Sequence, residues 1–333
     1  MRANKLKQLL EFAIKNNEPV LVSGAPGIGK TEIVKQVVAN MGCDLIISHP
    51  VVSDPTDYKG LPFYTGGTEA EFLPFGELNK LIKAEKKTVF FIDDLGQAAP
   101  SVQAAVMQLV LGREINGKKI SDNIIFFAAT NRREDKAGVA GILEPLKSRF
   151  STIIELTPTV DDWCEWANEE GLPIELVSFI RFRPELLFDF EAQVGMKNSS
   201  TPRTVTAVGR LMMKGLPASL EREVFAGAAG EGFAVEFVNY KKIMSKITSV
   251  DKIITDPKSV KVPTELSELY ATVACIVTKA TMKNIDNIVE WLQGTPMEMQ
   301  VFFFKDACAR QPKLKTEKSV KAWAAKAFKH IFE

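Results

Sequence analysis

The chain has 333 residues, 46% of them hydrophobic and 25% charged, a composition typical of a globular protein with room for two domains. Its net charge of +1 gives no overall attraction to nucleic acid, so such binding would need a local basic patch. No apolar run approaches the roughly 20 residues that span a bilayer, and the N-terminal segment lacks the apolar core of a signal peptide, so we expect no membrane insertion. The four cysteines are widely spaced without a CxxC pair, which indicates reduced thiols and a cytoplasmic location rather than a zinc site.

A glycine-rich stretch near the N-terminus fits the phosphate-loop pattern GxxxxGK[ST]. An amphipathic helix over residues 4–17 and an apolar strand over residues 19–23 precede it, and a helical pattern over residues 32–38 follows. The glycines let backbone N–H groups face a phosphate, and the start of the next helix adds positive charge. The residues predicted to bind the nucleotide are Gly24, Ala25, Pro26, Gly27, Ile28, Gly29, Lys30 and Thr31.

Within this loop, Lys30 is expected to reach the β- and γ-phosphates, and the hydroxyl of Thr31 to ligate Mg²⁺. The sequence therefore predicts a nucleoside-triphosphate site. A glycine turn without a ligand is the alternative interpretation.

The stretch over residues 54–75 follows a predicted second strand at residues 44–52 and is rich in proline, glycine and aspartate. We expect an irregular loop insertion here, followed by a polar helix over residues 76–87. Its aromatic residues, among them Phe72 and Phe75, either grip a substrate or pack locally under the loop, and the sequence leaves both interpretations open.

Two carboxylates end a continuous apolar run over residues 88–92, which is typical of a central strand buried on both faces. Acids at the carboxyl end of such a strand lie where open α/β sheets bind ligands. This is the pattern of a Walker B strand, in which Asp93 would hold Mg²⁺ through water and Asp94 would orient or activate the attacking water. A solvated turn is the alternative.

The next segments complete an alternation of strands and helices. A helix over residues 100–111 leads to an Asn-Gly hairpin over residues 112–120, with Lys118 and Lys119 near its tip, either solvated or in contact with nucleic acid. A buried strand over residues 123–130 ends at Asn131, a side chain that reaches either the γ-phosphate or the attacking water, or simply forms a turn. With a last strand at residues 152–156, the alternation predicts a parallel doubly wound sheet with helices on both faces.

From residue 159 onward the pattern becomes helical. We expect helices that open near residue 161 and over residues 203–213, one continuous helix over residues 221–240, and a polar connector over residues 251–263. Further helices follow to the C-terminus.

With these pieces in order, the chain resembles the AAA+ ATPases and, within them, the MoxR-like and dynein-related group. Residues 54–62 are similar to the segment before that group's helix-2 insertion, the hairpin at residues 116–117 to its pre-sensor hairpin, and residues 201–204 to its sensor 2 signature. The resemblance covers roughly residues 1–245 and implies that Asn131 is sensor 1, Arg149 an arginine finger and Arg203 sensor 2. A surface arginine in an intramolecular salt bridge is the alternative for Arg149.

This resemblance implies an AAA+ P-loop domain over residues 1–157, an α-helical lid over residues 158–245 and a C-terminal helical extension over residues 246–333. It implies ATP and Mg²⁺ as cofactors, a homo-oligomeric hexameric ring, and a protein partner, which in this group often carries a von Willebrand A-type domain. The expected activity is ATP hydrolysis that remodels or loads that partner. A nucleic-acid motor or loader, and a nucleotide-dependent scaffold with little turnover, are the alternatives.

One residue departs from the family pattern. The family usually has glutamate after the Walker B aspartate, and this chain has Asp94. Because aspartate is one methylene shorter, the attacking water would have to lie closer or be reached indirectly, which puts the rate of hydrolysis, but not nucleotide binding, in question.

Overall fold

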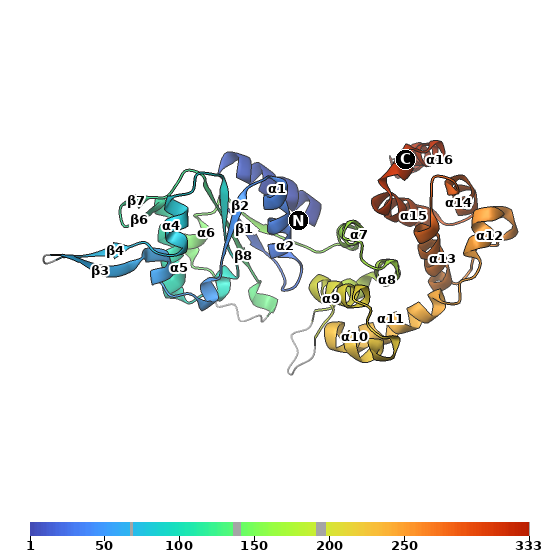
Figure 1. The fold of residues 1–333 in the computed structure, drawn as a ribbon, viewed down its shortest axis with the longest axis horizontal. Coiled ribbons are helices and arrows are strands. Elements are labelled where there is room, and N and C mark those ends of the chain that lie inside the picture. The colour runs from blue at the N-terminus through green and yellow to red at the C-terminus, as the bar shows by residue number, and fades with distance from the viewer. Residues whose placement is uncertain (67–68, 136–140, 191–197, 333) are drawn as a thin grey trace. The chain divides into compact units, whose positions relative to one another are not determined.

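A computed structural model describes residues 1–66, 69–135, 141–190 and 198–332 of the chain. The chain divides into two compact units, Met1–Pro158 and Thr159–Glu333. The first unit combines a sheet with helices, and the second is helical (Figure 1). No helix among the described residues is both long and apolar enough to cross a membrane.

The first unit is built on a five-stranded sheet in the order β2-β5-β8-β1-β9, in which every pair of neighbours is parallel. The strands β5 and β8 lie next to each other between β2 and β1. Both are buried along their whole length, as their continuous apolar sequences predict. The predicted doubly wound α/β class is therefore confirmed. The strands are β1 (Val20–Ser23), β2 (Asp44–Ser48), β5 (Thr88–Ile92), β8 (Ile124–Thr130) and β9 (Thr152–Glu155).

Helices cover both faces of this sheet. Figure 1 shows α1 and α2 on one side and α4, α5 and α6 on the other. Leu6, Leu10 and Ile14 of α1 are fully buried, which follows from their spacing along one helical face. The helices of this unit are α1 (Ala3–Asn16), α2 (Lys30–Asn40), α3 (Thr56–Lys59), α4 (Glu77–Ile82), α5 (Pro100–Gly112) and α6 (Glu144–Lys147).

Two antiparallel hairpins extend the first unit. The expected Asn-Gly hairpin is present as β6 (Glu114–Ile115) and β7 (Lys118–Lys119), with φ of 48° at Asn116 and 79° at Gly117, as a type I′ turn requires. The insertion was predicted to be irregular, but it contains α3 and a hairpin of β3 (Leu61–Gly66) and β4 (Glu69–Leu73). Pro62 obscured the strand pattern, because proline is tolerated only where its missing N–H is not needed for a ladder.

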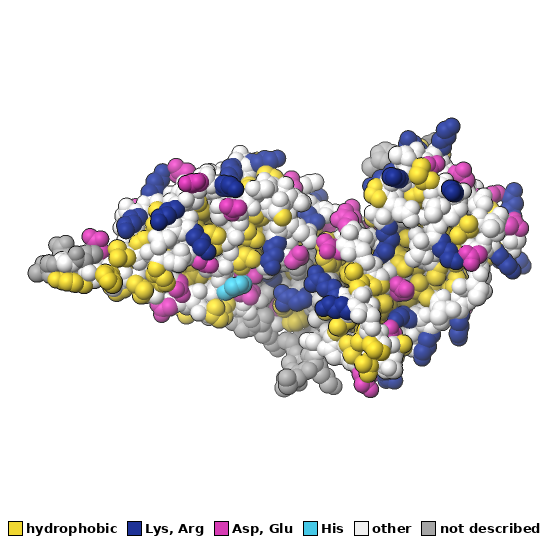
Figure 2. Space-filling view, in the orientation of Figure 1, with side chains coloured by type: hydrophobic (Ala, Val, Ile, Leu, Met, Phe, Trp, Pro, Cys, Tyr) yellow, Lys and Arg dark blue, Asp and Glu magenta, His cyan; other side chains and the backbone are white. Residues whose placement is uncertain are grey.

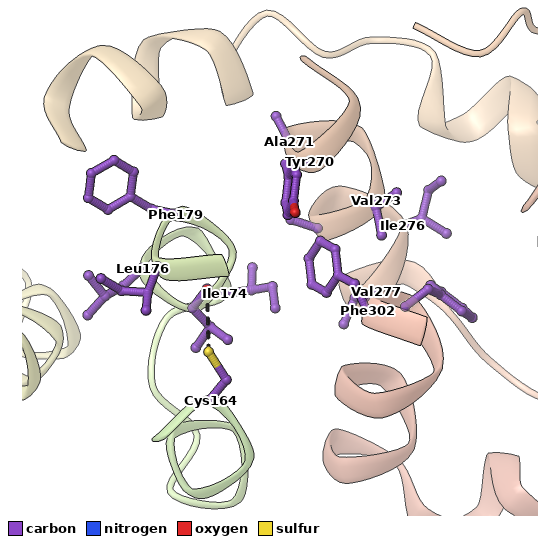
Figure 3. Packing of buried hydrophobic residues seen from close by; sticks show 14 of the residues in the cluster. Cys164, Ile174, Leu176, Phe179, Tyr270, Ala271, Val273, Ile276, Val277 and Phe302 are labelled. Atoms are coloured by element: carbon purple, nitrogen blue, oxygen red, sulfur yellow. Dashed lines mark hydrogen bonds between the residues drawn. The ribbon is translucent and has the colours of Figure 1, made fainter. Parts of the chain in front are cut away.

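The second unit has one hydrophobic core, which extends from Trp163 to Val320. Figure 3 shows part of it, with Phe179, Tyr270 and Phe302 contributed by three different helices. Helices on both sides of residue 245 share this core, and the predicted division there remains a prediction. The helices are α7 (Val160–Glu169), α8 (Ile174–Phe182), α9 (Pro202–Met213), α10 (Glu221–Ala229), α11 (Glu231–Met244), α12 (Val250–Thr255), α13 (Leu266–Lys279), α14 (Ile285–Leu292), α15 (Met297–Arg310) and α16 (Lys318–Phe332).

Two expectations about the second unit were wrong. The continuous helix expected over residues 221–240 is two helices, because Gly230 has φ of 98° and ends α10. A glycine inside an apolar pattern fits either close packing or a helix end, and only the backbone angle distinguishes them. The connector expected over residues 251–263 contains most of α12, and Ile253 of this helix is buried.

Candidate nucleotide site

The glycine-rich loop joins β1 to α2, as predicted. Gly24, Gly27 and Gly29 all have positive φ, at 156°, 77° and 94°. A Cβ at Gly24 would lie 2.6 Å from Ile28 Cδ1 and 2.8 Å from the Leu156 carbonyl oxygen, so only glycine fits there. The loop therefore has the tight backbone that a phosphate cradle requires.

Lys30 begins α2 and is buried, with 7% of its surface exposed. Its Nζ donates hydrogen bonds to the carbonyl oxygens of Gly24 (2.9 Å) and Ala25 (2.8 Å) and to Asn131 Oδ1 (2.8 Å). The ammonium group is thus held within the loop and against the end of β8, where the helix N-terminus also favours an anion.

Thr31 and Asp93 meet beside this lysine. The Thr31 hydroxyl donates to Asp93 Oδ2 at 2.7 Å, and Asp93 is buried at the end of β5. Hydroxyl and carboxylate oxygens are the hard ligands that Mg²⁺ takes together with phosphate and water. These two residues therefore fit a magnesium ion, which when bound would neutralise phosphate charge.

Asp94 and Asn131 form the next pair along the same edge of the sheet. Asn131 Nδ2 donates to Asp94 Oδ1 at 3.2 Å, and Asn131 is buried while Asp94 is half-buried. Asp94 has φ of 57° and ψ of 35°, a left-handed conformation that aspartate tolerates better than most residues. Asn131 thus contacts both Lys30 and Asp94, and the structure brings together five of the predicted residues.

Arg132 was missed from the sequence. It follows Asn131 and donates from Nε and Nη2 to both carboxylate oxygens of Asp135 (3.0 and 2.8 Å) and from Nη1 to Glu155 Oε1 (2.9 Å). The hydrogen bonds to Asp135 are the main reason that the pKa of Arg132 is raised. The bidentate pair with Asp135 fixes the backbone beside Asn131, and the hydrogen bond to Glu155 ties the end of β8 to the end of β9. The acids at residues 134, 135 and 155 were visible in the sequence, but only the parallel pairing of the strands brings the last one close.

Arg149 lies between α6 and β9. In the parallel register Val20 pairs with Thr152 and Ser23 with Glu155, so Arg149 precedes the amino end of β9 while the phosphate loop follows the carboxyl end of β1. Four strand residues separate these two edges by about 13 Å. Among the described residues, the buried Nε of Arg149 has no hydrogen-bond partner.

Arg203 belongs to the second unit, so its relation to the nucleotide site stays a prediction. It is the second residue of α9 and is exposed. Thr201 caps this helix in a reciprocal capping box with Thr204, which fixes the helix start that carries the arginine.

A glycine cradle, a buried lysine and paired acids at the carboxyl edge of a parallel sheet define a P-loop nucleotide-binding unit. A family model described as "ATPase family associated with various cellular activities (AAA)" matches residues 20–158. This part of the chain is therefore an AAA ATPase domain, which implies nucleotide binding. The matched range contains every predicted site residue except Arg203.

Relatives of known identity are distant. The Holliday junction branch migration complex subunit RuvB of Mycoplasma pneumoniae is 23% identical over 196 residues, covering 55% of this chain and 53% of that protein. The corresponding protein of Clostridium kluyveri is 23% identical over 206 residues, covering 60% of this chain and 52% of that protein. The chain thus spans about half the length of the curated relatives it matches. A solved structure of the Thermotoga maritima RuvB branch migration motor is 17% identical, covers 75% of this chain and 76% of that chain, and has a TM-score of 0.40.

Proposed function

We propose that this protein is a ring-forming ATPase that uses hydrolysis to remodel or load a protein partner, as MoxR-like proteins do. The observation that carries the proposal is the contact of Asn131 with both Lys30 and Asp94, since it joins a phosphate-binding cation to a candidate base in one polar network. A glycine turn that binds no ligand would not require this network.

Each residue of the network has a role that its contacts support. Lys30 and the loop N–H groups would bind and neutralise the phosphates, and Thr31 and Asp93 would hold Mg²⁺. Asp94 orients the attacking water and accepts its proton, and Asn131 aligns Asp94 with the γ-phosphate. The left-handed backbone at Asp94 supports this role, because strained conformations gather at sites where a side chain must be aimed.

Arg149 completes the site of a neighbouring copy, and this is why assembly into a homo-oligomeric, hexameric ring belongs to the proposal. Buried polar atoms are nearly always paired, so the unpartnered Nε favours a partner outside the chain. No ion pair joins Arg149 to any carboxylate of the described residues, which argues against the surface salt bridge. Arg203 acts on its own chain's nucleotide from the helical lid.

The insertion hairpin favours a protein partner. Phe63, Tyr64 and Phe72 lie on β3 and β4 with 63%, 65% and 45% of their surfaces exposed, and Figure 2 shows hydrophobic side chains along this hairpin. Exposed aromatic side chains are enriched at protein interfaces. A partner with a von Willebrand A-type domain remains part of this proposal, and its support is the resemblance alone.

A nucleic-acid motor is the second candidate, and the names of the RuvB relatives favour it. Of the basic side chains that would contact nucleic acid, some already bind groups of their own chain. Arg113 donates to the carbonyl oxygens of Ser121 (3.1 Å) and Ile124 (3.0 Å) and therefore holds the base of the hairpin. Lys118 is exposed, and Lys119 pairs with Asp122 at 3.1 Å. A steep fall of DNA affinity with salt concentration would support this candidate.

The ATPase proposal is tested by mixing inactive chains. Arg149→Ala should bind ATP but hydrolyse it about 10³- to 10⁵-fold more slowly. Lys30→Ala supplies an intact Arg149 to its neighbours, so mixing the two should restore turnover. Lys147→Ala is the matched control, because this nearby cation pairs with Glu144 of its own chain. Turnover per chain that is independent of protein concentration, with no recovery on mixing, contradicts the ring; absent turnover in the assembled parent favours the scaffold.

The partner is tested with an Asp94→Asn chain, which should hold ATP and retain bound proteins. The same chain with Phe63→Ser and Phe72→Ser should lose a specific partner while keeping its nucleotide. These residues are exposed, so the fold should be unaffected. Capture that is equal with and without the aromatic residues argues against the hairpin.

A further inference from the structure

Gln103 is a polar side chain in the buried face of α5, with 1% of its surface exposed. Its Nε2 donates to the carbonyl oxygens of Ala98 (3.1 Å) and Gly141 (2.9 Å), and its Oε1 accepts from the backbone N–H of Leu143 (3.0 Å). Both donor hydrogens and one acceptor site are used, all on backbone groups. A buried amide saturated in this way fixes the segments that it touches.

The first segment follows the catalytic acids directly. Asp94 is followed by a 3₁₀ turn, Leu95–Gln97, and then by Ala98, whose carbonyl oxygen accepts from Gln103. Gly96 of that turn accepts a hydrogen bond from the N–H of Gly141 at 3.3 Å. The turn behind Asp94 is therefore joined to Gly141 both directly and through Gln103.

The second segment leads to Arg149. Leu143 precedes α6, and its carbonyl oxygen accepts from the N–H groups of Leu146 (2.9 Å) and Lys147 (3.2 Å). The carbonyl oxygen of Leu146 accepts in turn from the N–H of Arg149 at 3.1 Å. An unbroken run of hydrogen bonds thus connects the Gln103 amide to the backbone of Arg149.

We infer that Gln103 is a positioning residue for Arg149, which it holds at the angle that the neighbouring copy's nucleotide requires. The inference depends on the proposed function, because it assumes that Arg149 acts on a neighbour. Gln103 touches none of the reacting atoms; it anchors the start of α6 to the core of its own chain. A displacement of a catalytic group by about 1 Å can lower a rate on the order of 10²-fold.

The test uses Gln103→Met, which keeps the volume of the side chain and removes its hydrogen bonds. We expect nucleotide affinity within about threefold of the parent and a loss of turnover on the order of 10²-fold. Gln108→Met is the matched control, since Gln108 is exposed on the same helix and should leave turnover unchanged.

Mixed assemblies then locate the defect. A Gln103→Met chain keeps its own phosphate loop, so a Lys30→Ala chain, which supplies an intact Arg149, should restore its turnover. An Arg149→Ala chain should not, because neither member of that mixture supplies a placed arginine. The inference is overturned if turnover recovers with Arg149→Ala instead of Lys30→Ala, recovers equally with both, or recovers with neither. A loss of nucleotide binding by Gln103→Met overturns it as well.

Leu143→Pro is a second variant that leaves Gln103 in place. It removes the N–H that donates to Gln103, and the φ of −57° at Leu143 lies within the range of proline. It also replaces a leucine side chain that packs against the core of this unit, so the stability of the variant is measured alongside its turnover. It should show the same pattern of recovery. The mixture of Arg149→Ala with Lys30→Ala is the reference: if it does not recover, the proposed function fails; if it recovers and the Gln103 and Leu143 variants do not follow, only the positioning role fails.

Discussion

In the α/β unit the buried ammonium group of Lys30 donates to two loop carbonyls and an amide oxygen, whereas in the helical unit the buried guanidinium of Arg181 faces a carboxylate. Arg181 on α8 donates from Nε to Asp306 Oδ2 on α15 at 3.0 Å, and only 9% and 1% of these side chains are exposed. The guanidinium also lies over the ring of Phe302, 5.4 Å from its centroid. Both units bury a cation, but with different kinds of partner.

The difference separates a binding arrangement from a structural one. Two of the three acceptors of Lys30 are carbonyls of its own loop, five and six positions away, and the third is Asn131 at the ligand-binding edge of the sheet. These contacts therefore present the cation to a ligand. Arg181 and Asp306 are 125 positions apart and hold two helices together. Loss of the first cation should therefore remove function, and loss of the second should remove stability.

The largest effect is expected for Lys30→Ala. ATP affinity should fall more than about a hundredfold, because charge-assisted hydrogen bonds to the phosphates are lost. Titration with a fluorescent ATP analogue measures this. Lys35→Ala is the control, since Lys35 is exposed on the same helix. Unchanged affinity in Lys30→Ala would show that the loop does not bind phosphate.

Asp94 gives the next largest effect. Asp94→Asn should keep nucleotide and lose about 10²- to 10⁴-fold in turnover, the usual contribution of a general base. Asparagine also tolerates the left-handed backbone found here, so the turn should survive. Asp94→Glu should keep or raise turnover. Phosphate release by assembled protein measures both, and parental rates in both variants would show that Asp94 does not face the water.

In the helical unit, Arg181→Met should lower the free energy of unfolding by about 3–5 kcal/mol, because it leaves the buried Asp306 carboxylate unpaired. All four tryptophans, at residues 163, 166, 291 and 323, lie in this unit, so their fluorescence during urea unfolding reports on it alone. The double variant Arg181→Met with Asp306→Leu should recover most of the loss. ATP affinity should be unchanged. A fall in ATP affinity without a fall in stability would mean that Arg181, like Lys30, serves binding rather than structure.

The two units also differ in how far the sequence predicts them. The sheet was predictable because strands buried on both faces are continuous apolar runs, and their carboxyl ends bring Asp93 and Asn131 to one edge. The roles of Asp94, Arg149 and Arg203 remain predictions. Gln103 was missed because a single polar residue on an apolar helix face has no signature until its backbone partners are known.

The helical unit offered less. The sequence around Arg181 does not indicate that its ion-pair partner is Asp306, because only the packing of α8 against α15 brings two residues this far apart together. The break at Gly230 and the extra helix α12 were missed for a similar reason, since they depend on backbone angles and burial that a periodic pattern does not determine.

The smallest effect is expected for Asp161 on α7, which is a second and more exposed carboxylate partner of Arg181 beside Asp306. Asp161 accepts from Arg181 at 3.3 Å and pairs with Lys305 at 3.1 Å, and 48% of its side chain is exposed. Burial raises its pKa, but the ion pairs with Lys305 and Arg181 outweigh burial, so the pKa lies below its usual value. Because solvent screens such a pair, its contribution to stability should not exceed about 1 kcal/mol.

The sign of the pH dependence follows from this lowered pKa. A carboxyl that is more acidic when folded stabilises the protein above its unfolded pKa of about 4, and the contribution is lost as the pH falls through the lower folded value. The unfolding free energy of the parent should therefore exceed that of Asp161→Asn by a constant amount above about pH 5. The difference should begin to shrink near about pH 4 and vanish only below the lower folded pKa. Using the difference cancels the other carboxylates that titrate in acid. Glu231→Gln, which breaks an ion pair with Arg222 in the same unit where both side chains are 67% exposed, should show no such step. A difference that persists in acid would mean that Asp161 stabilises the unit through packing rather than through its charge.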